Sequence, residues 1–97
     1  MYAVIRRYNI HPDKVDELAQ SAHAEFVSCI KQSPGFIGYH LINAGNGVAI
    51  TFSLFENQAA ADHSTQLAGA WVKQNLSSIV EQPPEITEGE VLVHAFK

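Results

Sequence analysis

The sequence predicts an α+β fold of the ferredoxin-like type, in which an antiparallel four-stranded sheet carries both helices on one face. Two observations lead to it. Short runs of β-branched and aromatic residues lie at 2–10, 36–43 and 48–55, as strands require. Apolar residues at helical spacing separate the first two runs and follow the third. The resulting order, βαββαβ, is the split βαβ arrangement, and 97 residues make it a single domain, 1–97.

The first strand, 2–10, is followed by an amphipathic helix. Residues 11–13 end the strand, and Pro12 or Asp13 begins the helix, because proline tolerates the first turn and aspartate suits the positive end of the helix dipole. The segment 33–35 ends the helix after about five turns. Its apolar positions recur at three- and four-residue steps: Val15, Leu18, Ala22, Phe26, Cys29 and Ile30.

The middle of the chain predicts a hairpin. The runs 36–43 and 48–55 are joined through 44–47, where two glycines and Asn46 accept the positive φ of a tight turn.

A second helix is expected from residue 58 towards residue 80, with Asn57 as its N-terminal cap. Gly69 within this region is expected to mark a kink or a break between two shorter helices. Residues 81–85 are expected to form a loop, and 88–96 the fourth strand.

Strands 36–43, 48–55 and 88–96 carry uncharged side chains on both faces, except at the start of the last one. Alternate residues of a strand share a face. In 48–55 one face has Val48, Ile50, Phe52 and Leu54, and the other has Ala49, Thr51, Ser53 and Phe55. In 36–43 one face has Phe36, Gly38, His40 and Ile42, and the other has Ile37, Tyr39, Leu41 and Asn43. Two helices cover one face, and a solvated second face would be more polar. The pattern therefore predicts a homodimer with sheet packed on sheet, the alternative being a mixed, weakly exposed face.

Composition restricts the partners and the compartment. The net charge is −4, and among the six basic residues only Arg6 and Arg7 are adjacent, which argues against nucleic acid. The one cysteine, Cys29, cannot form an intrachain disulfide, which fits a reducing cytoplasm. Residues 1–10 contain charge within their apolar run, so they predict a first strand and not a signal peptide. No membrane span is expected.

The chain resembles the antibiotic biosynthesis monooxygenase (ABM) domain family of the dimeric α/β-barrel superfamily. The segments that carry the resemblance are MYAVIRRYNIHPDKVDEL, SPGFIGYHLI and AITFSLFENQAAADHS. The resemblance implies the fold, the dimer and a pocket in each subunit between sheet and helices. Some relatives oxidise polycyclic aromatic substrates with O₂ and no metal or prosthetic group, others bind and degrade haem, and many have no assigned activity.

The haem-degrading relatives use an asparagine on the first strand, and a tryptophan and a histidine on the second helix. Aligned through HPDKVDE, these positions fall near Arg6, His63 and Lys73, and none of the three matches. The resemblance therefore implies no haem. His40 and His94 lack metal-ligand spacing, so neither a metal nor another cofactor is expected.

Five residues are expected to line the pocket. His63, Trp71 and Tyr8 are the candidate catalytic residues, because a histidine titrates near neutral pH and the two aromatic rings could hold a flat substrate. Arg6 and His40 are the candidate substrate-binding residues, since an arginine on the covered face needs a carboxylate or a ligand anion.

Each candidate has a structural alternative. Trp71 could be a core or interface residue, His63 an exposed helix residue and His40 a hydrogen-bonded interior histidine. Whether Arg6 or Arg7 points towards the helices stays open, because adjacent strand residues face opposite ways.

Two functions follow. The first is a small cofactor-independent monooxygenase that binds an electron-rich phenol or quinol, deprotonates it and lets O₂ react with the anion. The second is a non-catalytic dimeric α/β-barrel protein for ligand binding or stress response, with its pocket closed by side chains. A catalytic site should be a cleft of roughly 300 Å³ or more with a few convergent polar groups.

Overall fold

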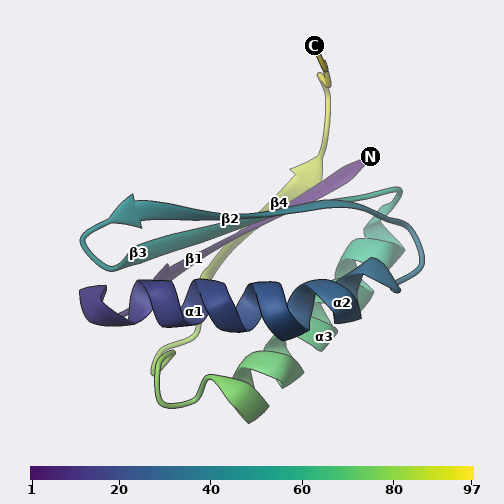
Figure 1. Ribbon diagram of the computed structural model, residues 1–97. Coiled ribbons are helices and arrows are strands. Elements are labelled where there is room, and N and C mark those ends of the chain that lie inside the picture. Colours follow the sequence, from purple (N-terminus) through teal and green to yellow (C-terminus); the bar gives the residue numbers. More distant parts are fainter.

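The computed structural model describes all 97 residues and has the predicted ferredoxin-like α+β fold. Four strands form one antiparallel sheet in the order β2-β3-β1-β4. They are β1 (Tyr2–Asn9), β2 (Phe36–Gly45), β3 (Val48–Phe55) and β4 (Glu85–Glu90). All the helices lie on one side of the sheet, which leaves the other side open (Figure 1).

The first helical layer is continuous from residue 12 to residue 31 but changes its winding. A 3₁₀ turn, η1 (Pro12–Lys14), leads into α1 (Val15–Ser21), a π-helical turn, η2 (Ala22–Phe26), and α2 (Val27–Lys31). The predicted apolar stripe is buried at Val15, Leu18, Ala22, Phe26 and Ile30. Cys29 is exposed, so its assignment to the stripe was wrong. The buried positions advance in steps of four from Leu18, which rotates Cys29 about 100° away from Ile30.

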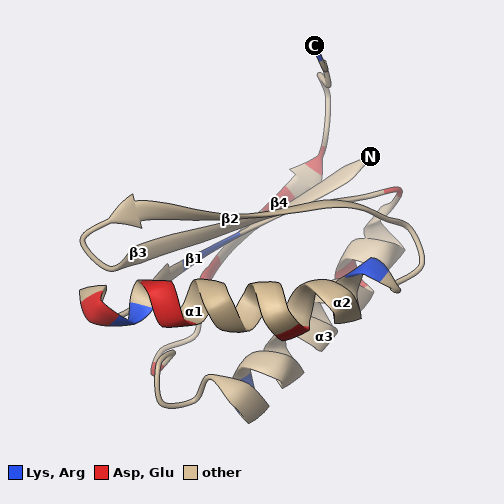
Figure 2. Cartoon of the chain, in the orientation of Figure 1, with Lys and Arg blue, Asp and Glu red and all other residues tan.

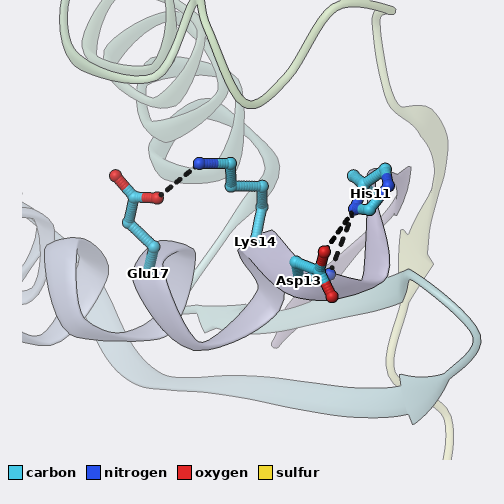
Figure 3. Close-up of polar contacts among 4 residues, drawn as sticks. All are labelled: His11, Asp13, Lys14 and Glu17. Carbon is cyan, nitrogen blue, oxygen red and sulfur yellow. Dashed lines mark hydrogen bonds and ion pairs between the residues drawn. The ribbon is translucent and has the colours of Figure 1, made fainter.

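The start of this layer follows the predicted turn chemistry (Figure 3). The backbone N–H of Asp13 donates to Nδ1 of His11 at 3.3 Å, and Nζ of Lys14 lies 3.4 Å from a carboxylate oxygen of Glu17. These groups are exposed, so the ion pair contributes little to stability.

A bulge in β2 changes which of its residues face the helices. The pairing with β3 shifts between Phe36 and Gly38, and Phe36 packs at 6.1 Å ring separation against Phe55 on the helix-covered face. The prediction that Phe36 shares a face with His40 was therefore wrong. Beyond the bulge Tyr39 points to the helices, and His40 lies on the open face, opposite Phe52.

The second helix, α3 (Gln58–Asn75), has the expected cap, because Asn57 accepts a hydrogen bond from the N–H of Ala60 at 2.9 Å. It passes through Gly69 without a break and ends five residues before the predicted end. The apolar pattern in the sequence continues beyond Asn75, because Leu76 and Ile79 are buried although they follow the end of the helix. None of the helices combines the length and apolarity needed to cross a bilayer.

The fourth strand occupies Glu85–Glu90, not the predicted 88–96. It pairs with β1 from Arg7 opposite Glu85 to Tyr2 opposite Glu90, and the last bond runs from Val91 N to Met1 O. Residues 91–97 extend beyond Tyr2, the first residue of β1, so no part of β1 lies beside them for pairing. Leu92, Val93 and Phe96 are 82–87% exposed on this tail, which leads away from the sheet (Figure 1).

The two faces of the sheet differ in what covers them. Val4, Arg6 and Tyr8 of β1 are buried against the helices, and Arg7 is exposed on the open face. Arg6 is therefore the arginine that points to the helices. The open face of β2 and β3 carries no charge, as predicted (Figure 2), and Ile42 is 48% exposed there.

We predict that Gly47→Ala destabilises the fold more than Gly45→Ala does. Both glycines have positive φ, which costs an alanine about 1–2 kcal/mol. A Cβ at Gly47 would also clash with the carbonyl oxygen of Ile10, whereas the space beside Gly45 is open. Urea unfolding of the two variants measures the difference, and equal midpoints would contradict it.

Candidate functional site

The candidate site is centred on a buried guanidinium. The Arg6 side chain is on the covered face of β1, and the residue is only 3% exposed. Its Nη2 donates to Oγ1 of Thr65 on α3 at 2.9 Å, and Thr65 in turn donates to the carbonyl of Ala61 at 3.1 Å. No carboxylate lies within 4.0 Å of Arg6. Arg6 thus has one hydrogen bond and no counter-ion, and most of its N–H groups remain free for a ligand.

Burial works against this charge without removing it. Desolvation lowers the pKa of Arg6, and the nearby acidic groups Tyr8, Tyr39 and Glu88 raise it by smaller amounts. An arginine starts from so high a pKa that it stays charged at neutral pH. A buried cation without a partner is costly, which makes Arg6 the first candidate for binding an anion.

Three hydroxyl groups accompany Arg6. Thr51 lies directly opposite Arg6 on β3, and its buried Oγ1 has no hydrogen-bond partner. Burial raises the pKa of Tyr8, and it raises the pKa of Tyr39 to about 12, with Tyr8 adding to the effect and Arg6 opposing it. Both phenols are therefore protonated at neutral pH and can donate hydrogen bonds, as can the hydroxyl of Thr51.

These four polar residues line a small cavity between sheet and helices. Its volume is about 20 Å³, room for one water molecule or one ligand atom. The remaining lining is apolar: Leu18, Ala22, Phe26, Leu41, Ala68, Trp71, Val72 and Leu76. The ring of Phe26 packs against Tyr39 at 5.4 Å and against Trp71 at 5.2 Å, which gives the cavity an aromatic wall.

A larger cleft adjoins the cavity. Its volume is about 380 Å³, and it shares Arg6, Tyr8, Ala68 and Val72 with the cavity. The cleft runs along α3 past Lys73 to the segment after the helix, and its other lining residues are Thr65, Gly69, Ser77, Val80, Glu81, Gln82, Pro83, Pro84 and Ile86. The small cavity is therefore the inner end of a cleft that meets the size expected of a ligand site.

The structure brings together three of the five predicted pocket residues. Arg6, Tyr8 and Trp71 line the cavity, but His40 and His63 do not. His40 is exposed on the open face because of its strand phase, and His63 is exposed on α3 beside a separate cleft that Glu56 also lines. Ala61 and Thr65 of α3 face inwards, so a residue midway between them points out. The prediction that all five residues share one pocket was wrong for the two histidines.

Sequence reasoning missed Tyr39, Thr51 and Thr65 as members of the site. The alternation of side chains along β2 and β3 was visible in the sequence, and it places Tyr39 and Thr51 on the helix-covered face of their strands. What placed Thr51 beside Arg6 is the register of β1 with β3, which joins residues 45 positions apart and leaves no local signal.

A family profile described as antibiotic biosynthesis monooxygenase matches residues 1–70. A sequence search of curated proteins gives no match. The matched part is more than half of the 97 residues, so the chain belongs to the antibiotic biosynthesis monooxygenase family.

Solved structures share the whole fold at low identity. A protein of unknown function from Nitrosomonas europaea has a TM-score of 0.81 at 19% identity, covering 99% of this chain and 93% of that one. The monooxygenase ActVA-Orf6 of Streptomyces coelicolor, in complex with nanaomycin D, has a TM-score of 0.79 at 16% identity. The match covers 99% of this chain and 91% of that one. A mutant of MhuD with two manganese protoporphyrin IX molecules per active site has a TM-score of 0.78 at 17% identity, and the match covers 100% of both chains. At such identities the likeness establishes the fold alone.

We predict that Arg6→Met stabilises the protein. Methionine fills a similar volume without the desolvation cost of the cation, and Thr65 keeps its bond to Ala61, so the free energy of unfolding should rise by about 1–4 kcal/mol. Chemical denaturation checks this, with Lys31→Met at an exposed position of α2 as the control. A destabilised Arg6→Met would mean that the native protein already compensates the charge.

Proposed function

We propose that the protein is a cofactor-independent monooxygenase that acts on an electron-rich aromatic substrate, a phenol or quinol, in the cleft beside Arg6. The observation that carries the proposal is the convergence of hydrogen-bond donors on one small cavity with an aromatic wall, at the inner end of the cleft. Arg6, Thr51, Tyr8 and Tyr39 surround one small cavity. Preorganised donors of this kind stabilise an oxyanion that develops during a reaction.

The two volumes assign different parts of a substrate to different places. A cavity of about 20 Å³ is too small for an aromatic ring but accepts one oxygen substituent. A cleft of about 380 Å³ accepts the rings. The substrate would therefore place its oxygen beside Arg6 and its ring system between α3 and the segment 77–84, with Tyr8 at the boundary of the two spaces and Trp71 in the wall of the inner one.

The reaction proceeds from the substrate anion. Loss of the O–H proton places negative charge on the oxygen and, by resonance, on a ring carbon that carries hydrogen. That carbon bonds to one atom of O₂, the peroxide that forms takes up a proton, and loss of water leaves a carbonyl group. One oxygen atom enters the product and the other leaves as water. Arg6 holds the oxyanion, and the proposal gives neither His40 nor His63 a role.

Two related structures support a flat ligand. ActVA-Orf6 is a monooxygenase that was solved with nanaomycin D, and MhuD was solved with a porphyrin. The small inner cavity favours the second candidate function, binding without catalysis, because bulky side chains already fill most of the space between the layers.

We further propose that the working form is a homodimer, with the open faces of two sheets packed together. Ile5 on β1 and Ile42 on β2 are 36% and 48% exposed on this face, and β3, which carries no charge, lies between these two strands. Monomers rarely leave such patches uncovered. The tail after Glu90, with its exposed Leu92 and Phe96, would gain contacts from the same partner.

For catalysis, we predict that the protein consumes O₂ with anthrones or naphthalene quinols and inserts one labelled oxygen atom into the product. Arg6→Met should lower kcat/KM about 100-fold or more, the cost of losing an oxyanion donor. Lys31→Met, at an exposed position of α2 that lines neither the cavity nor the cleft, should match the wild type. An oxygen electrode and mass spectrometry provide the measurements. If no quinol, anthrone or haem is turned over, binding without catalysis becomes the function.

For assembly, we predict a dimer by analytical ultracentrifugation. Ile42→Lys, which places a charge on the uncharged open face of β2, should raise the dimer dissociation constant at least tenfold. Ala70→Lys, on the exposed side of α3, is the matched control and should stay dimeric. A wild-type protein that sediments as a stable monomer would contradict the proposed dimer.

A further inference from the structure

The cavity and its cleft contain no obvious base. The first helical layer contributes only Leu18, Ala22 and Phe26, and no histidine lines either space. The one carboxylate in the lining is Glu81, an exposed residue of the cleft and not of the inner cavity. A substrate oxygen beside Arg6 therefore has no carboxylate or imidazole in the cavity to receive its proton.

The charged and titratable groups around Arg6 come from every neighbouring element. They are Tyr8 on β1, Tyr39 on β2, Glu88 on β4, Lys73 on α3 and Glu81 after α3. Burial keeps the two tyrosines protonated, because it raises the pKa of both. Glu88 faces Arg6 only at a distance, beyond the 4.0 Å of an ion pair. The inner cavity is thus dominated by one cation and by hydroxyl donors.

An ionised phenol fits this cavity better than a neutral one, because only the oxyanion cancels the charge of Arg6. The guanidinium can donate hydrogen bonds but cannot accept one. The hydroxyl of Thr51 lacks a partner although it is buried, which is costly unless a ligand supplies one. An oxyanion offers lone pairs to Arg6, Thr51 and the tyrosines together, and it cancels the uncompensated charge.

We propose that the site selects acidic phenols, quinols and enols and binds them as oxyanions, with Arg6 rather than a protein base driving loss of the proton. The O–H bond breaks, its electron pair stays on the oxygen beside Arg6, and the proton leaves to solvent through the open cleft. This inference deepens the proposed function and rests on the same site, but it needs no reaction with O₂.

The size of the effect follows from charge proximity. An opposite charge within about 4–6 Å raises the acid dissociation constant of a carboxyl group about 10- to 1000-fold, and we expect the same range for a bound phenol. Because the pKa of the bound phenol is then below that of the free phenol, the phenolate binds more tightly than the phenol by that factor. Affinity should rise with pH between the two pKa values and level off above the pKa of the free phenol.

The test uses 4-nitrophenol, which O₂ does not oxidise and whose phenolate has its own visible absorption band. A pH titration of the probe with saturating protein gives the pKa of the bound form, and calorimetry at several pH values gives the affinity. The methyl ether 4-nitroanisole, which cannot ionise, serves as the ligand control and should bind at least tenfold more weakly at high pH.

Three variants separate the roles. Arg6→Met should abolish the pH-dependent gain in affinity, Arg6→Lys should retain part of it because it keeps the charge, and Lys31→Met, on the exposed side of α2, should behave as the wild type. A bound pKa equal to or above that of the free probe would overturn the proposal. So would an absence of binding at high pH, where the probe is already ionised, or an unchanged titration in Arg6→Met.

The outcome is distinguishable from that of the proposed function. If 4-nitrophenol binds as its phenolate and no quinol consumes O₂, the monooxygenase fails and the oxyanion site stands. If quinols consume O₂ while bound 4-nitrophenol keeps its proton, the monooxygenase stands and the oxyanion site fails.

Discussion

The burial of one guanidinium without a counter-ion governs the rest of this site. Arg6 lies in the middle of the sheet, 3% exposed, where most folds place an apolar residue. A single bond to Thr65 holds it in position, and the surrounding core cannot close completely over a charged group that still needs partners. The stability given up at Arg6 is the physical source of the affinity that the cleft could have for an anion.

The two layers are built to make room at this point. Small residues from the sheet and from both helical layers line the cavity: Thr51 on β3, Ala22 on η2 and Ala68 on α3. Large residues close the space further out, with Phe26 packed on Trp71 and on Tyr39. The π-helical turn contributes to this arrangement, because it holds both Ala22 and Phe26 against the cavity. Such turns are frequent at functional sites.

Local signals predicted the fold, and non-local pairing determined what the sequence left open. Asn57 and the glycines around Asn46 act within a few residues, so the cap and the hairpin were predictable. The fourth strand was predicted too late in the chain, because residues 91–96 have high β propensity. The antiparallel pairing with β1 stops at Tyr2, before it reaches them. The site depended on register in the same way. Nothing local places Thr51 opposite Arg6, and a bulge in β2 changed the phase of that strand.

The chain contains a single tryptophan, and it stands in the wall of the cavity beside Phe26. Its indole emission therefore comes wholly from the inner end of the cleft, without background from elsewhere in the molecule. A ligand that enters would change the polarity and the quenching around this ring. The protein thus carries a native optical reporter of occupancy, and ligand libraries could be screened against it without dyes, labels or added tags.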